Sequence, residues 1–233
     1  MYTKHSIQVN NERVAYFEYP TQKELKGIIL FCHGFPGTWR LTTMAPQLNE
    51  HGYTLEEINY RGDQDSDGAF SFLGSVQDVE TLAKHLKQQY PNVPLTALGY
   101  SAGGFYVLCS IRKNPDLFDN IVLLNSLLDV SFTQTPIMED LWADAQQTIR
   151  LKDKEFYQAE INKMNELFNP IKFVSELTPR ISIIQSASDE LLPIEVVKDF
   201  FGKLQNPEEL IWIPDAGHAL RGDEKELINV LIK

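Results

Sequence analysis

Short, near-continuous apolar runs separated by helical patterns constrain the fold of this chain more than any other feature of its sequence. The runs occupy residues 27–32, 54–58, 95–98, 121–124, 181–185 and 210–213. Such runs are typical of strands buried on both faces of a parallel sheet, because half-exposed strands alternate apolar and polar side chains. Segments with apolar residues at helical spacing lie between them, at residues 75–89, 102–113, 194–204 and 224–232. The alternation predicts an α/β fold with a mostly parallel central sheet flanked by helices.

Two parts of the chain depart from this alternation. Asn10 and Asn11 separate two strand-like segments and tolerate positive φ, so the chain is expected to open with an N-terminal β-hairpin. Residues 126–178 have helical periodicity without a strand signal, which predicts a small helical cap insertion over the carboxyl ends of the strands. The expected division is therefore a core domain of residues 1–125 and 179–233 and a cap of residues 126–178.

Composition excludes several classes of protein. The 233 residues are 43% hydrophobic, which is enough for a full core and excludes a disordered chain. A formal charge of −11 without a Lys/Arg cluster argues against nucleic acid, where binding depends on neutralising phosphates. No apolar run approaches the ~20 residues that span a bilayer, so no membrane span is expected. The start has no apolar secretory segment, and Cys32 and Cys109 lie in apolar runs, so we expect a cytoplasmic location.

The motif Gly99-Tyr100-Ser101-Ala102-Gly103 directly follows the predicted strand at residues 95–98 and opens the predicted helix at residues 102–113. In this context a G-x-S-x-G turn strains its serine and exposes the hydroxyl above the sheet. The adjoining helix N-terminus favours a developing oxyanion. We therefore predict that Ser101 is a nucleophile, with a plain glycine-rich turn as the alternative.

A serine hydroxyl needs a base, and His218 is the histidine best placed to act as one. It follows the predicted strand at residues 210–213, in a loop at the carboxyl end of that strand. Asp189 follows the preceding predicted strand, where a carboxylate is able to orient the imidazole and stabilise its charged form. Glu190 and Asp129 are the alternative acids, and a helix-capping role is the alternative for Asp189.

The loop His33-Gly34-Phe35-Pro36-Gly37 follows the first predicted parallel strand. Its glycines let backbone N–H groups face the nucleophile, so we assign the N–H groups of Phe35 and Ala102 to an oxyanion hole. His33 is expected to hold this loop through hydrogen bonds rather than to act as a second base.

Four apolar or aromatic side chains near these motifs are predicted to contact a substrate: Phe35, Tyr100, Leu128 and Trp142. Leu128 and Trp142 belong to the expected cap, and their character favours an apolar acyl or alcohol group. Ordinary packing of cap against core explains these two side chains equally well.

The segment Asp63-Gln64-Asp65-Ser66-Asp67-Gly68 begins like an EF-hand calcium loop. Its twelfth position requires a bidentate Glu and is Gly74 instead, and no helix precedes the loop. We interpret the segment as a solvated acidic turn, predict no metal and no cofactor, and leave open whether this loop binds an ion.

Together these motifs resemble the α/β-hydrolase superfamily of serine hydrolases. The resemblance rests on residues 33–37, on residues 99–103, and on Asp189 and Gly217-His218 in the superfamily's order of Ser, Asp and His. Residues 60–68 resemble a loop of monoacylglycerol-lipase-like and cinnamoyl-esterase-like members, which usually have Gly where this chain has Asp63 or Asp65. The resemblance covers nearly the whole chain and implies the α/β-hydrolase fold, a Ser-His-Asp hydrolase and a helical cap.

The expected activity is cleavage of a carboxylic ester of a small or medium, partly apolar substrate through an acyl-enzyme. Peptidase, thioesterase and acyltransferase activities use the same triad and stay open. A non-catalytic binding module on this fold is the alternative from a different class. The serine at position 101 argues against dehalogenases and epoxide hydrolases, which use Asp as nucleophile. The physiological substrate and the oligomeric state are not determined by the sequence.

Overall fold

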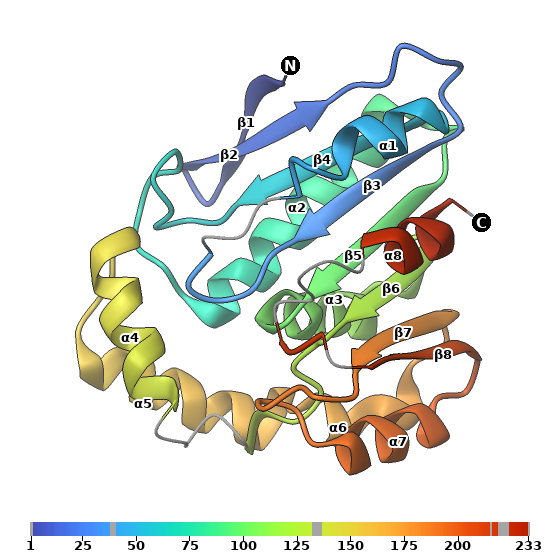
Figure 1. Cartoon of the computed structure of the whole chain (residues 1–233). Helices are drawn as coiled ribbons and strands as arrows, with labels where there is room; N and C mark the ends of the chain where they lie inside the picture. Colours follow the sequence, from blue (N-terminus) through green and yellow to red (C-terminus); the bar gives the residue numbers. More distant parts are fainter. Residues whose placement is uncertain (1, 38–40, 132–136, 215, 219–223, 233) are drawn as a thin grey trace.

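The computed structural model describes residues 2–37, 41–131, 137–214, 216–218 and 224–232. In this part of the chain one eight-stranded sheet has the order β1-β2-β4-β3-β5-β6-β7-β8. β1 pairs with β2 and β2 with β4 in antiparallel fashion, and all other neighbouring strands are parallel. Helices cover both faces of the sheet (Figure 1). The prediction of a mostly parallel sheet flanked by helices is therefore confirmed.

The observed elements agree closely with the sequence periodicity. The strands are β1 (Thr3–Val9), β2 (Glu12–Tyr19), β3 (Gly27–Cys32), β4 (Tyr53–Asn59), β5 (Leu95–Tyr100), β6 (Asn120–Leu124), β7 (Ile181–Ser186) and β8 (Pro207–Ile213). The helices are α1 (Ala45–Glu50), α2 (Phe72–Gln89), α3 (Ala102–Lys113), α4 (Ile137–Thr148), α5 (Lys154–Lys163), α6 (Pro170–Phe173), α7 (Ile194–Lys203) and α8 (Glu224–Leu231). Sequence periodicity missed α1, because six residues with two buried side chains are too short to show a helical repeat.

The predicted hairpin is confirmed at the N-terminus. Asn10 and Asn11 have φ values of 48° and 66°, and their strands β1 and β2 pair in register from Val9–Glu12 to Thr3–Glu18. Asn adopts positive φ at lower cost than other residues with a Cβ, which explains why it occupies this turn.

Each face of the sheet has its own hydrophobic core, and β3 contributes to both. Ile28 and Leu30 pack in the core that includes residues of α2, α3 and α7. Ile29 and Phe31 pack in the core that includes residues of α1 and α8. Every residue of β3 is buried, and each Leu, Ile or Phe side chain removed from water stabilises the fold by roughly 1.5–3 kcal/mol. Burial on two faces is the reason for the continuous apolar runs of the sequence.

The helices α4, α5 and α6 lie between β6 and β7 along the chain, and α4 and α5 lie on the side toward which β3 and β5 point (Figure 1). Polar side chains attach these helices to the segment that follows β4. The Arg150 guanidinium donates to the Asp63 carbonyl at 2.9 Å, the Tyr157 hydroxyl donates to the Phe70 carbonyl at 2.9 Å, and the Glu160 carboxylate accepts from the backbone N–H of Phe72 at 3.0 Å. The division into core and cap domains at residues 126–178 stays a prediction.

None of the helices in the described residues combines the length and the apolar character that a bilayer crossing requires.

Glu56 on β4 is a buried carboxyl group without full hydrogen bonding. The residue is 1% exposed, and its Oε2 has no hydrogen-bond partner within the described part of the chain. Burial, with a smaller contribution from the nearby Glu18 charge, raises the pKa of Glu56 to about 9. The folded protein thus keeps a proton at neutral pH that the unfolded chain has released, so this group destabilises the fold increasingly as pH rises from about 4.5 to about 9.

Replacing Glu56 with Gln is expected to raise the free energy of unfolding by about 1–3 kcal/mol at pH 8, because an amide has no proton to lose. Denaturant unfolding at pH 5 and pH 8 measures the effect, which should be smaller at pH 5. Glu50→Gln, at an exposed position at the end of α1, is the control and should change little at either pH. An equal gain at both pH values for Glu56→Gln would contradict the buried, protonated state.

Candidate active site

Ser101 occupies the sharp turn between β5 and α3 and has a strained backbone, with φ 53° and ψ −123°. Residues with a Cβ seldom adopt positive φ, and such a conformation persists only where the surroundings hold it. The Ser101 N–H donates to the Leu124 carbonyl at 3.1 Å, and the Ser101 carbonyl accepts from the N–H groups of Gly104 and Leu127 at 3.1 and 2.8 Å. β6 and α3 therefore hold the turn that presents the Ser101 hydroxyl.

Two glycines allow the backbone to pack around this turn. A Cβ atom at Gly34 would lie 2.7 Å from Ser101 Cβ, and a Cβ atom at Gly103 would lie 1.8 Å from the Cys32 carbonyl oxygen. Both distances are too short for any side chain. Gly34 and Gly103 thus bring the loop after β3 directly against Ser101 and the start of α3.

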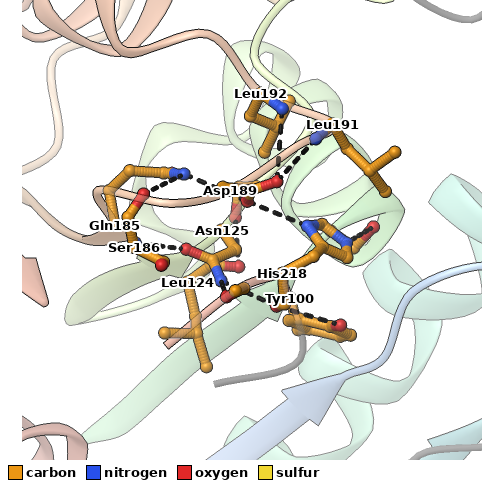
Figure 2. Close-up of polar contacts among 12 residues, drawn as sticks. Tyr100, Leu124, Asn125, Gln185, Ser186, Asp189, Leu191, Leu192 and His218 are labelled. Carbon is orange, nitrogen blue, oxygen red and sulfur yellow. Dashed lines mark hydrogen bonds and ion pairs between the residues drawn. The ribbon is translucent and has the colours of Figure 1, made fainter. Parts of the chain in front are cut away.

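The imidazole of His218 lies between Ser101 and Asp189. His218 Nε2 is 3.0 Å from Ser101 Oγ, and His218 Nδ1 is 2.9 Å from Asp189 Oδ2. Figure 2 shows the ring of His218 turned toward Asp189. These three residues stand 29 and 117 positions apart in the sequence, and the carboxyl ends of β5, β7 and β8 bring them together.

Asp189 is a buried carboxylate whose oxygens are hydrogen-bonded. Its side chain is 0% exposed. Oδ1 accepts from the N–H groups of Leu191 and Leu192 at 2.8 and 3.3 Å, and Oδ2 accepts from Gln185 Nε2 at 3.1 Å (Figure 2). These bonds offset the cost of removing a charge from water and fix the orientation of the carboxylate.

The alternative acids lie elsewhere. Asp129 Oδ1 accepts from Asn169 Nδ2 at 2.7 Å and from the Ser131 hydroxyl at 2.7 Å. Partial burial raises the pKa of Asp129, but these hydrogen bonds outweigh it and lower the pKa below its usual value. Glu190 is exposed. Of the three candidates, Asp189 is the one whose carboxylate contacts His218.

Residues 33–37 include Phe35, whose N–H is a predicted oxyanion donor, and we name them the oxyanion loop for that prediction. This loop is held by His33. This residue is 5% exposed; its Nδ1 lies 2.9 Å from the Gly34 carbonyl and its Nε2 lies 3.2 Å from Asp63 Oδ2. Burial alone would lower the pKa of His33, but the hydrogen bond and charge of Asp63 and the bond to Gly34 outweigh burial and raise it. A protonated imidazole has two donors, which match these two acceptors.

The acidic segment after β4 is in part buried, so its interpretation as a solvated turn is wrong at Asp63, which is 6% exposed and paired with His33. Asp65 forms an ion pair with Lys4, and Asp67 with Arg13. The three carboxylates thus have separate partners. In the described ranges no group of three or more His, Cys, Asp or Glu side chains is arranged to hold a metal ion.

The predicted substrate-contacting residues have different environments. The Phe35 and Trp142 rings are 5.0 Å apart, and the Tyr100 ring is 5.3 Å from the His218 ring. Leu128 is 0% exposed, so it offers no surface to a ligand in this conformation. The substrate role of these residues stays a prediction.

Sequence reasoning missed two buried residues at this site, Gln185 and Asn125. Both are 0% exposed and lie at the carboxyl ends of β7 and β6, where a polar residue in an apolar run is the available signal.

Residues 23–159 match the family described as "Serine aminopeptidase, S33", and residues 140–232 match a family described as "PhoPQ-activated pathogenicity-related protein". A monoacylglycerol lipase from Mycolicibacterium smegmatis is 22% identical to this chain over 142 residues. The aligned part covers 58% of this chain and 51% of the lipase, so the chain spans about half the length of that relative.

Several solved structures share the fold at low sequence identity. Est1E from Butyrivibrio proteoclasticus with bound ferulic acid has a TM-score of 0.80 at 17% identity, covering 98% of this chain and 96% of Est1E. A thermostable carboxyl esterase from Bacillus coagulans in complex with glycerol has a TM-score of 0.78 at 16% identity, covering 99% and 96%. An α/β serine hydrolase homologue from Coxiella burnetii has a TM-score of 0.69 at 18% identity, covering 99% and 95%. These likenesses establish the α/β-hydrolase fold.

Replacing Asp63 with Asn tests the pair that holds the oxyanion loop. Because the folded pKa of His33 is raised, the charged pair stabilises the fold below the ordinary histidine pKa of about 6.5, and this contribution is lost as pH rises through the folded value. Asp63→Asn should therefore lower the free energy of unfolding by about 1–3 kcal/mol at pH 6 and by less at pH 9. Denaturant unfolding at both pH values measures this loss.

Asp67→Asn is the matched control. Asp67 also has a cationic partner, Arg13, but its side chain is 52% exposed, and surface pairs contribute only about 0–1 kcal/mol. A loss at Asp63→Asn as small as that of the control would show that the His33 pair does not stabilise the loop.

Proposed function

Since this chain belongs to the serine aminopeptidase S33 family, within the α/β-hydrolase superfamily of serine hydrolases, we propose that it cleaves a carboxylic ester with Ser101 as nucleophile, His218 as base and Asp189 as the orienting acid. One observation carries this proposal. Ser101 Oγ, His218 and Asp189 form an unbroken chain of hydrogen bonds of 3.0 and 2.9 Å. The distance between Ser101 Oγ and His218 Nε2 lies within the reach that proton transfer requires, and the distance between His218 Nδ1 and Asp189 is that of an orienting hydrogen bond.

The first half-reaction transfers the acyl group to the enzyme. Ser101 Oγ attacks the ester carbonyl carbon while His218 Nε2 takes the hydroxyl proton, and the carbonyl oxygen becomes an oxyanion. Asp189 accepts from Nδ1–H, holds the required tautomer and stabilises the imidazolium. The tetrahedral intermediate then expels the alkoxide, which receives the proton from Nε2 and leaves as an alcohol.

The N–H groups of Phe35 and Ala102 are the proposed oxyanion donors. Ala102 is the first residue of α3, and the first N–H groups of a helix have no intrahelical acceptor. The contact of Gly34 with Ser101 brings the oxyanion loop beside the same hydroxyl. Each donor of this type contributes about 2.7–4 kcal/mol of transition-state stabilisation.

Water completes the cycle. His218 Nε2 takes a proton from water as its oxygen attacks the acyl carbonyl of the Ser101 ester, and a second tetrahedral oxyanion forms. Its collapse returns the proton to Ser101 Oγ and releases the carboxylic acid.

A cluster of aromatic side chains at the oxyanion loop supports the proposal that the substrate is small or medium in size and partly apolar. The Phe35 ring lies 5.1 Å from Phe70, 5.2 Å from Phe72 and 5.0 Å from Trp142.

Peptidase activity is a second candidate because the family description names aminopeptidases. Comparing kcat/KM for a series of acyl esters, a thioester and an aminoacyl arylamide separates the proposed esterase from these alternatives.

A fluorophosphonate probe should label Ser101, as mapped by mass spectrometry of the modified peptide. Ser101→Ala should abolish labelling and lower ester turnover about a thousandfold or more, and His218→Ala should slow labelling strongly, because both groups act as one unit. Ser6→Ala, at an exposed position on β1, is the matched control and should label like the wild-type protein. Unchanged turnover in Ser101→Ala would contradict the proposal, and a folded protein that never labels would favour a non-catalytic binding module.

Asp189→Asn should lower kcat by about four orders of magnitude, because the amide favours the wrong imidazole tautomer. Asp129→Asn is the comparison variant and should change kcat only a few-fold, since Asp129 contacts Asn169 and Ser131 instead of His218. Steady-state kinetics on one ester measures both. The reverse ranking of the two variants would assign the acid to Asp129.

A further inference from the structure

Asn125 lies where the segments carrying the three proposed catalytic residues meet. It directly follows β6, is 0% exposed, and has a φ of 39°. Positive φ strains a residue that has a Cβ, although Asn tolerates it better than most. A buried and strained polar residue beside a reaction centre indicates a role that outweighs these costs.

The side-chain amide of Asn125 uses both its donor and its acceptor. Nδ2 donates to the carbonyl of His218 at 2.7 Å and to the carbonyl of Gly217 at 3.2 Å. Oδ1 accepts from the N–H of Ser186 at 2.8 Å. Figure 2 shows Asn125 between Ser186 and His218. An amide is the side chain of this size that donates to two carbonyls and accepts from an N–H group at the same time.

Through these bonds Asn125 links the end of β7, which precedes Asp189, to the loop after β8, which carries His218. Ser186 is the last residue of β7 and precedes Asp189 by three positions, whereas His218 lies in the loop after β8. The backbone N–H of Asn125 also donates to the Ile184 carbonyl at 3.0 Å, which fixes Asn125 itself to β7. On the other side, the Ser101 N–H is bound to Leu124, the residue before Asn125.

We propose that Asn125 is a positioning residue that sets the place of the His218 imidazole relative to Ser101 and Asp189 by clamping the His218 backbone; this inference rests on the proposed function. The hydroxyl of Tyr100 donates to the same His218 carbonyl at 3.3 Å, and the neighbouring Gly217 N–H donates to Ser188 Oγ at 3.1 Å; the bond from Asn125 at 2.7 Å is the shortest of these contacts. Loss of the clamp lets the imidazole shift, and displacements of about 1 Å at a reacting centre cost up to about a hundredfold in rate.

Asn125→Asp is the most informative variant. Asp has nearly the same shape, tolerates the positive φ and keeps an acceptor for the Ser186 N–H, but an ionised carboxylate turns an oxygen toward the carbonyls of Gly217 and His218. Asn125→Ala removes the bonds to all three groups. For both variants kcat should fall ~10–100-fold while KM changes less than about threefold, because the variants move the base and leave the substrate contacts.

Two further readouts separate positioning from a merely structural role. The downfield proton resonance of the hydrogen bond between His218 Nδ1 and Asp189 should shift or broaden in both variants, in protein without substrate. The acidic limb of the pH profile of kcat/KM should also move.

Asn49→Ala is the matched control: Asn49 Nδ2 also donates to two carbonyls, those of Tyr19 and Tyr53 at 2.9 Å, but near the amino end of β4. It should lower stability without moving either readout.

The outcomes distinguish this inference from the proposed function. If Ser101→Ala abolishes turnover while both Asn125 variants keep kcat and the downfield resonance of the wild type, the positioning role is wrong and the nucleophile stands. If the Asn125 variants lose activity only in proportion to their unfolded fraction, as Asn49→Ala does, the role is structural and the inference is again wrong. If Ser101→Ala retains turnover, the proposed function fails, and the inference fails with it.

Discussion

The close approach of backbone at the carboxyl ends of β3 and β5 is the constraint on which the rest of the site depends. Gly103 lies against the Cys32 carbonyl and Gly34 lies against Ser101, at separations that leave no room for a Cβ atom. This packing sets the oxyanion loop beside the strained turn at Ser101, which hydrogen bonds to Leu124, Gly104 and Leu127 hold in place. The strained conformation persists because β3 and β5, which lie beside the turn, are buried at every residue. Burial of their apolar side chains stabilises the fold by more than the strain costs.

Buried carboxyl groups among the described residues divide into those whose oxygens have hydrogen-bond partners and those with an oxygen that has none. Burial raises the pKa of Asp78 to about 6, while the Arg61 guanidinium beside it acts in the opposite direction. The carboxylate of Asp63 has the His33 imidazole, and that of Asp189 has three hydrogen-bond donors besides His218. Glu56 Oε2 has no hydrogen-bond partner among the described residues, and burial raises the pKa of this carboxyl group to about 9. Hydrogen-bond donors around a buried carboxyl group offset the cost of removing it from water.

The helices α4 and α5 pack against the oxyanion loop through aromatic side chains. Phe35 contacts Trp142 of α4, and Trp142 lies 4.7 Å from Tyr157 of α5. Tyr157 and Glu160 in turn bind the backbone at the start of α2. The aromatic side chains beside the oxyanion loop therefore also hold these helices in place, so substitutions at Phe35 or Trp142 are expected to affect the packing of α4 and α5.

Local patterns in the sequence determined the fold class, the hairpin at Asn10 and Asn11, most strand and helix positions, and the strand-end context of Ser101, Asp189 and His218. These follow from apolar periodicity and turn chemistry within windows of a few residues. Tertiary structure alone decided which side chains meet: the 3.0 Å contact of His218 with Ser101, the burial of Asp63 against His33, and the three-way contact of Asn125. Those contacts join residues 30 to 117 positions apart. The distances in these contacts depend on the order and register of the strands. No local pattern encodes that order, because strand pairing depends on burying both faces of the whole sheet at once.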